Sequence, residues 1–345
     1  MRHHFAPAVF LLVALSVTLV ACSATTSVPR GPVPEGHWVR YKHVPQVVDL
    51  AGPRSNGSFT VAADGRLFNL TSAGVLTPFA RGASGYATPL GPEPYITAPG
   101  SDRVAGSSCS FNSGATFALA PAAPAGVIEI SQAGVARRFA SVPGAARPDG
   151  ITYDSTGHFG HRILVTARNH GRTTVLAIDC TGGVHTVTTN APSVEGGIAV
   201  APASFGRYAG DLIAPDESSG RVFAIAPSGT VTVLAQSGLP HGGDIGVESA
   251  GFVPAGFRAS DSAYLADRFS KGNKHPGTDS ILRLPGAELL SAGVHAGDLL
   301  VASEGSARTI AVHCGSSCSV KYVAIGLAVS HAEGHIVFGA LGKGA

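Results

Sequence analysis

The stretch that decides the fold runs from Gly196 to Gln236 and reads GGIAVAPASFGRYAGDLIAPDESSGRVFAIAPSGTVTVLAQ. Four short apolar runs are separated by turns rich in Gly, Pro and Ser, and Pro227, Ser228 and Gly229 form the tightest of these turns. The spacing predicts strands over 198–201, 211–214, 221–226 and 230–235. Four consecutive strands within about 40 residues are typical of one blade of a β-propeller.

The same four-strand pattern recurs on both sides of this stretch. Preceding copies place strands at 151–154, 162–167, 174–179 and 184–188, and at 95–98, 115–120, 127–131 and 135–140. Another copy begins with 250–253, 263–267 and 280–284, and one more contains 298–303, 309–313 and 320–324. Near the ends, 67–70 and 75–79 resemble third and fourth strands, and 327–330 and 335–338 resemble first and second strands.

This repeat predicts an all-β fold, a β-propeller of six blades whose ring is closed by strands from both termini. Closure of the ring leaves no free sheet edge, so we expect a monomer. Seven blades follow if 59–62 opens a blade of its own. A pair of β-sandwiches is the other all-β alternative, although no linker divides the repeats.

Composition agrees with an all-β chain and excludes one class of partner. The 345 residues include 45 glycines and 23 prolines, as expected for many short strands joined by tight turns. Charged residues make up only 13%, with 24 Lys and Arg against 22 Asp and Glu. Because no broad basic surface follows from this balance, we expect no nucleic-acid partner.

The N-terminus has the features of an export signal. Arg2, His3 and His4 precede an apolar run over 5–20 that is short for a membrane span. Leu19, Val20, Ala21 and Cys22 resemble a bacterial lipobox, in which Cys22 receives the lipid; an ordinary cleavage site near Ala24 is the alternative. We therefore expect a lipoprotein signal peptide at 1–21, a flexible tether at 22–36 and a propeller domain at 37–345. The mature protein would be extracytoplasmic, held to the bacterial cell envelope by its lipid anchor alone.

The other four cysteines are expected to form disulfides. An even number of cysteines in an oxidising compartment favours bridges over free thiols. Cys314 and Cys318 flank a short turn between two strand-like runs, so a bridge can close that hairpin, and Cys109 with Cys180 follows by elimination. A zinc site is the alternative, but no Cys-x-x-Cys pair or clustered histidine spacing supports it. His313 and His335 lie inside predicted strands and are interpreted as packing residues.

Acidic residues precede the first strand of four successive predicted blades: Glu93, Asp149, Glu195 and Glu248. The segments that follow second strands are polar too, with Asn169 and His170, Asp216 and Glu217, Asp267 and Arg268, and Glu304. Both positions converge on the central channel of a propeller, and the loop with His241 is predicted on the same face. Carboxylates gathered there repel one another unless a cation lies between them. The sequence thus predicts a Ca²⁺ site, with Mg²⁺ as second choice, although such acids also cap turns in any propeller.

Two short motifs carry a family resemblance: Pro148, Asp149, Gly150 and Ile151, and Glu195, Gly196, Gly197 and Ile198, each followed by a strand and a glycine-rich turn. With these motifs, most of 58–341 resembles the senescence-marker-protein/gluconolactonase family, the regucalcin-like six-bladed propellers. The resemblance implies a divalent metal, usually calcium, in the central channel, and in many members the hydrolysis of lactones. By position, it implies ligand roles for Glu93, Glu195 and Glu248, an amide ligand in Asn169, and a ligand that also serves as general base in Asp216.

The sequence supports two alternative functions. In the first, bound Ca²⁺ polarises the carbonyl of a lactone or related ester, and Asp216 or His241 accepts a proton from water. The chain has no Gly-x-Ser-x-Gly motif, which disfavours a serine esterase. In the alternative, the protein is a non-enzymatic surface propeller that recognises a carbohydrate, peptide or cell-wall ligand, and the metal is structural or absent.

Overall fold

The structure is a computed structural model that describes residues 36–79, 94–122, 124–144 and 146–342. Cys22, Glu93 and the whole of 1–35 lie outside the described residues. The described chain is almost entirely β, and its strands are interrupted by one short helix, α1 (Gly286–Ser291), and one 3₁₀ turn (Gly206–Tyr208). None of its helices has the length and apolar character needed to cross a membrane.

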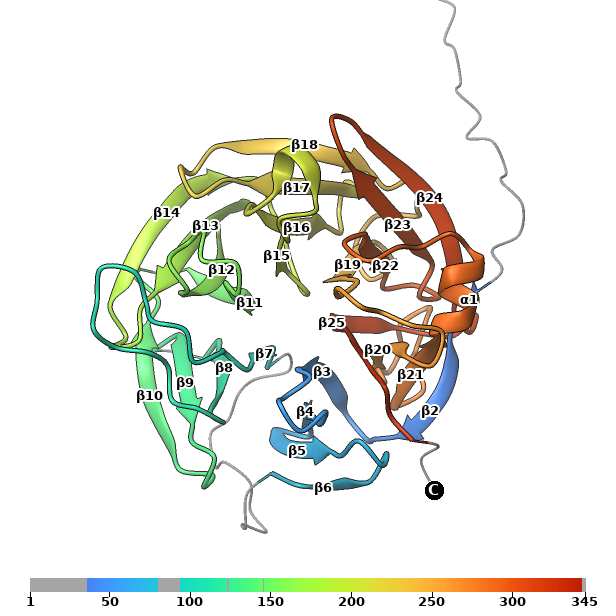
Figure 1. Ribbon diagram of the computed structural model, residues 1–345, viewed down its shortest axis with the longest axis horizontal. Coiled ribbons are helices and arrows are strands. Elements are labelled where there is room, and N and C mark those ends of the chain that lie inside the picture. Colours follow the sequence, from blue (N-terminus) through green and yellow to red (C-terminus); the bar gives the residue numbers. More distant parts are fainter. Residues whose placement is uncertain (1–35, 80–93, 123, 145, 343–345) are drawn as a thin grey trace, which may run out of the picture. The chain divides into compact units, whose positions relative to one another are not determined.

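Four four-stranded antiparallel sheets follow one another along the chain, with β3, β7, β11 and β15 nearest their common centre (Figure 1). The first sheet contains β3 (Val47–Ala51), β4 (Phe59–Ala63), β5 (Arg66–Leu70) and β6 (Leu76–Pro78). The second contains β7 (Ile96–Thr97), β8 (Thr116–Ala120), β9 (Gly126–Ile130) and β10 (Ala136–Ser141). The third contains β11 (Arg147–Tyr153), β12 (Ile163–Asn169), β13 (Arg172–Ile178) and β14 (Val184–Ala191), and the fourth β15 (Ala199–Val200), β16 (Leu212–Asp216), β17 (Arg221–Ile225) and β18 (Val231–Gln236).

The remaining strands form one nine-stranded sheet in the order β1-β24-β23-β22-β19-β25-β20-β21-β2. These are β1 (Gly36–His37), β2 (Val39–His43), β19 (Val247–Phe252), β20 (Ser262–Asp267), β21 (Ser280–Pro285), β22 (Leu299–Ser303), β23 (Thr309–Cys314), β24 (Cys318–Ile325) and β25 (Ala332–Gly339). Its two halves meet where Ala250 of β19 faces His335 of β25. Strands that follow one another in the chain belong to different halves of this sheet. β19 pairs with β22, whereas β20 pairs with β25 and β21, and β21 also pairs with β2.

The structure confirms the all-β propeller arrangement, and three copies of the predicted repeat lie in the second, third and fourth sheets. The strands that close the ring differ from the predicted ones. Residues 67–70 pair with β4 and residues 76–78 pair with 68–70, so both segments share a sheet with β3 rather than with the C-terminal segment, because Val47–Ala51 supplies a fully buried first strand. The ring is nevertheless completed from both ends of the described chain, since β25 and the N-terminal β2 flank β20 and β21.

Apolar side chains from neighbouring sheets pack together and hold the sheets in place. Phe117 and Ile151, for example, share one buried cluster between the second and third sheets. Each such side chain contributes about 1.5–3 kcal/mol when it leaves water. Both expected disulfides are present: Cys109–Cys180 joins the second and third sheets, and Cys314–Cys318 closes the β23–β24 hairpin.

Candidate functional site

The innermost strands and the loops beside them bring carboxylates to one mouth of the channel. The interacting acids are Asp149, Glu195, Glu217, Asp244, Glu248, Glu304 and Glu333. They come from every part of the described chain after residue 146, so only the closed ring gathers them. Cations, protons or hydrogen bonds must offset the repulsion between these carboxylates. The groups that do so differ from one part of the mouth to another.

Arg168 at the end of β12 contacts two of the predicted acids. Its Nε lies 2.7 Å from Oδ2 of Asp149, and its Nη1 and Nη2 lie 2.5 and 2.6 Å from the two carboxylate oxygens of Glu195. Such a bidentate contact fixes both the position and the charge of Glu195. Burial raises the pKa of Asp149, and the charge of Arg168 opposes that shift. This side of the mouth is therefore occupied by an arginine rather than open to a metal.

Tyr95 joins Glu248, the third predicted acid, to Glu333. The Tyr95 hydroxyl oxygen lies 2.5 Å from Oε1 of Glu248 and 2.7 Å from Oε2 of Glu333. One hydroxyl proton serves only one acceptor, so one of these carboxyl groups carries a proton of its own. Burial, followed by the charge of Glu333, raises the pKa of Glu248. The pKa of Glu333 is lowered despite its burial, by the hydrogen bond from His331 and the charge of Arg268, so of the two carboxyl groups Glu248 holds a proton more strongly.

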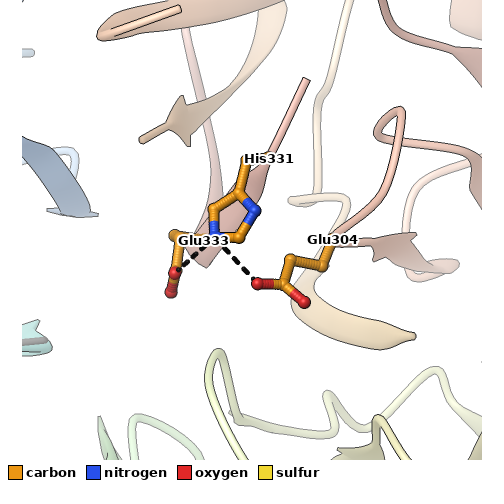
Figure 2. Close-up of side chains that lie close together, drawn as sticks. All are labelled: Glu304, His331 and Glu333. Atoms are coloured by element: carbon orange, nitrogen blue, oxygen red, sulfur yellow. Dashed lines mark ion pairs between the residues drawn. The ribbon is translucent and has the colours of Figure 1, made fainter. Parts of the chain in front are cut away.

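His331 lies between two glutamates (Figure 2). Its Nε2 is 2.8 Å from Oε1 of Glu304 and 3.3 Å from Oε1 of Glu333, and Nη1 of Arg268 lies 3.1 Å from the same Glu333 oxygen. Burial disfavours the imidazolium, but the hydrogen bonds to both glutamates outweigh it and raise the pKa of His331 to about 10. Burial also raises the pKa of Glu304 to about 8, although the His331 hydrogen bond acts against it. His331 is thus a cation near neutral pH and orients Glu304.

Glu217, Asp244 and Glu304 form the part of the mouth that fits a metal ion. One carboxylate oxygen from each lies within 4.8 Å of the others, and the three side chains are half-buried, exposed and buried respectively. Oε2 of Glu304 is buried and accepts no hydrogen bond. Burial, with a further contribution from the charge of Asp244, raises the pKa of Glu217. Three oxygen donors with room for water on one side suit a hard cation such as Ca²⁺.

The remaining predicted residues lie elsewhere. Asp216 uses its buried carboxylate to cap the turn after β16, where it accepts hydrogen bonds from the Ser218 N–H at 3.1 Å and from the Ser219 hydroxyl. Asn169, the last residue of β12, is exposed, and so is His241, which packs beside Gly220. The structure therefore brings Asp149, Glu195 and Glu248 into the network, while Glu93 lies outside the described residues.

The functional residues that the sequence reasoning missed fall into two groups. Glu217, Arg268 and Glu304 are at polar positions after second strands, which the repeat had singled out without assigning them a role. Arg168, His331, Glu333 and Tyr95 gave no separate signal. His331 and Glu333 join the site because β25 is an innermost strand, a position that the repeat assigned to 327–330 instead.

A buried ion pair closes the channel below the acidic mouth. Asp49 of β3 is fully buried, and its carboxylate accepts hydrogen bonds from the backbone N–H groups of Ile96 at 2.7 Å and His335 at 2.8 Å. Nδ1 of His335 lies 3.0 Å from both Asp49 oxygens. Burial disfavours the charged ring, but the Asp49 charge outweighs it and raises the pKa of His335. Beyond the pair, the innermost strands line a pocket of about 330 Å³.

The fold and the mouth together define a β-propeller with an acid-lined axial site. No protein-family model matches the chain, and no curated protein matches it. In solved structures, a chain of a nidogen/laminin complex is similar at 13% identity with a TM-score of 0.50, over 86% of each chain. Virginiamycin B lyase from Staphylococcus aureus is similar at 12% identity with a TM-score of 0.44, over 83% of this chain and 88% of the lyase. A gluconolactonase from Xanthomonas campestris is similar at 14% identity with a TM-score of 0.35, over 71% and 87%. At these identities the nidogen/laminin likeness describes the fold alone.

Proposed function

We propose that this protein binds Ca²⁺ at the channel mouth through Glu217, Asp244 and Glu304 and hydrolyses a lactone or related small ester there. The observation that carries the proposal is the convergence of the Glu217, Asp244 and Glu304 carboxylates, in which the buried Oε2 of Glu304 receives no hydrogen bond from a group other than a carboxyl. A buried carboxylate oxygen without a partner is costly unless a proton or a cation satisfies it. The choice of an ester follows the resemblance to the gluconolactonase family.

Different residues of the mouth have different roles in the proposed reaction. His331 holds Oε1 of Glu304, which leaves Oε2 directed at the site. Bound Ca²⁺ would polarise the ester carbonyl and stabilise negative charge on its oxygen. Burial raises the pKa of Glu217 above that of an ordinary glutamate, and this half-buried carboxylate is the group that we assign to accept a proton from water.

We further propose that the ring has six blades. The nine-stranded sheet has only the Ala250–His335 bridge between β19 and β25, and its division there gives two sets of four strands with β1 added at one edge. Six clusters of buried apolar side chains accompany this count. Each innermost strand then supplies one wall of the channel, which supports a single axial site.

We also propose that the protein is exported and lipid-anchored through Cys22. The apolar run over 5–20 and the lipobox-like Leu19 to Cys22 support export, and two disulfides suit an oxidising compartment. Replacement of Cys22 by Ser is expected to move the protein from the membrane fraction to the soluble fraction of the producing bacterium. An unchanged membrane fraction would contradict the anchor.

The metal site is tested by calcium titration of the C22S chain and of Glu217→Gln in that background. We expect one Ca²⁺ per chain, a melting temperature that rises with Ca²⁺ because only the folded protein binds it, and at least tenfold weaker binding in Glu217→Gln. Glu288→Gln on α1 is the matched control, because Glu288 accepts only a backbone hydrogen bond from His37 in the described contacts. Equal Ca²⁺ affinity in Glu217→Gln and Glu288→Gln would contradict the site.

Hydrolysis is tested separately on a panel of lactones with and without EDTA. We expect turnover that falls on chelation and in Glu217→Gln but not in Glu288→Gln. Calcium binding without turnover of any lactone would leave the metal site standing and refute the hydrolase. That outcome would favour the second function, a binding propeller, for which the pocket of about 330 Å³ at the far end of the channel offers a ligand site.

A further inference from the structure

A second cluster of metal-binding side chains lies on the nine-stranded sheet, outside the channel mouth. Asp298 directly precedes β22 and faces His313 of β23, one step beyond the Leu299–Val312 pair. Nδ1 of His313 lies 2.7 Å from Oδ1 of Asp298. The backbone N–H of His295 donates to the other oxygen, Oδ2, at 2.8 Å, and the His295 ring lies near it with Nδ1 at 3.8 Å, beyond hydrogen-bond distance. One carboxylate therefore holds the imidazole of His313 and the backbone of His295.

The burial of these groups determines which ring nitrogens face solvent. The Asp298 side chain is only 3% exposed, whereas those of His295 and His313 are 74% and 66% exposed. The His313 ring presents Nδ1 to the carboxylate, so its Nε2 is the nitrogen left for an ion, whereas no ring hydrogen bond to Asp298 fixes His295. The prediction that His313 is a packing residue is therefore wrong. In zinc proteins, a ligand histidine commonly donates its other ring N–H to a carboxylate, which fixes the tautomer and the ring orientation.

The surroundings leave room for an ion and its water ligands. His295, Asp298 and His313 line a pocket of about 280 Å³ together with Ser319 and Lys321. The Lys321 ammonium donates to the carbonyl oxygen of Ala292 at 2.5 Å, which holds it against the end of α1. Because His295 is mostly exposed, its ring can rotate toward an ion held by His313.

We propose that Nε2 of His313 and a ring nitrogen of His295 bind Zn²⁺, with Asp298 orienting the His313 ring and anchoring the backbone of His295, and with water completing the coordination. Neutral imidazole nitrogen suits Zn²⁺ and is a poor ligand for Ca²⁺, which prefers oxygen. The chain would thus carry two chemically distinct cation sites, one of oxygen donors at the channel mouth and one of histidines on the sheet. This inference does not depend on the proposed hydrolysis.

The test is Zn²⁺ titration of the untagged C22S chain by calorimetry, with Co²⁺ absorption as a second measurement. We expect one Zn²⁺ per chain at this site, binding at least tenfold weaker in His295→Gln and in His313→Gln, and a visible Co²⁺ band that both substitutions remove. Since both side chains are exposed, the melting temperature without metal is expected to stay unchanged.

Two control variants separate this site from other histidine and acidic groups. His185→Gln removes an exposed histidine whose Nε2 lies 3.5 Å from Oδ2 of a single acid, Asp179. Glu217→Gln alters the channel mouth. We expect both to retain full Zn²⁺ binding. The proposal is refuted if the parent chain binds no Zn²⁺, if His313→Gln binds as the parent does, or if His185→Gln loses binding to the same extent as His313→Gln.

Discussion

Substitution Asp49→Asn probes the ion pair that closes the channel. The side chain keeps its size, but its negative charge is lost and an amide NH₂ replaces one acceptor oxygen. In the parent, Oδ2 accepts the backbone N–H of Ile96 and Oδ1 accepts those of His335 and Leu50, so the new amide NH₂ meets an N–H donor in either orientation. The variant therefore leaves the His335 imidazolium buried without its counter-charge and places a donor against a donor.

The size of the effect follows from the burial of both partners. Removal of one partner from a buried ion pair costs about 3–5 kcal/mol. For a folded region of roughly 300 residues, the entropy of unfolding is about 0.6 kcal/mol per kelvin, so the melting temperature is expected to fall by about 5–8 °C.

The effect depends on pH in a defined direction. The Asp49 charge holds the pKa of His335 above its usual value, so the pair contributes its full stability below the unfolded pKa of about 6.5 and loses it as the pH rises through the folded pKa. The difference in stability between parent and Asp49→Asn is therefore expected to be largest near pH 6 and to shrink in alkaline buffer.

The assay is thermal and denaturant unfolding of the parent, Asp49→Asn, His335→Gln and the double variant. Asp64→Asn is the control, because Asp64 is an exposed turn residue at the end of β4. We expect the double variant to lose much less than the sum of the two single losses, which is the signature of direct coupling. Additive losses, or a loss in Asp49→Asn no larger than in Asp64→Asn, would refute this account of the channel centre.

Two further predictions concern the covalent and backbone framework. Cys109 and Cys180 are 71 residues apart whereas Cys314 and Cys318 are 4 apart, so loop-closure entropy predicts that Ser pairs cost about 4 and about 2 kcal/mol respectively; equal losses in chemical denaturation would contradict this. Gly334→Ala is expected to destabilise by more than about 1 kcal/mol, because Gly334 has φ of 66° and an added Cβ would lie 2.3 Å from Oδ1 of Asp49. Unfolding of Gly334→Ala beside the open-space control Gly315→Ala measures this, and equal stability of the two would be the contrary result.

The positions of the strands could be predicted from the sequence more accurately than the pairing between strands. Alternating apolar runs bounded by Gly and Pro locate β8 to β18 because each turn is a local feature. Strands β20 and β21 were also located, yet they pair with β25 and β2 instead of β19. A strand pattern gives the buried face and the length of a strand, but the choice between two equally apolar neighbours depends on packing across the whole ring.

The sequence predicts which segments contribute to the candidate site, but it does not predict which residue of each segment does so. Asp216 and Glu217 are adjacent, and the change of direction at the end of β16 turns Asp216 into the local turn while Glu217 faces the mouth. Asp149, Glu195 and Glu248 lie in one network, whereas Glu93 is outside the described residues, and Arg168 contacts two of the three. Such pairing depends on side chains from different strands, which spacing along one chain does not reveal.

The exchange of strands in the nine-stranded sheet has a consequence for chains that are incomplete. β19 must wait for β22, and β20 must wait for β25, so the half that contains β20 and β21 cannot be completed before β25 is present. A polypeptide cut short before residue 332 would lack both the ring closure and Glu333. Assembly of the acidic mouth thus requires β25, and a chain without this strand would expose the edge of β20 to proteases.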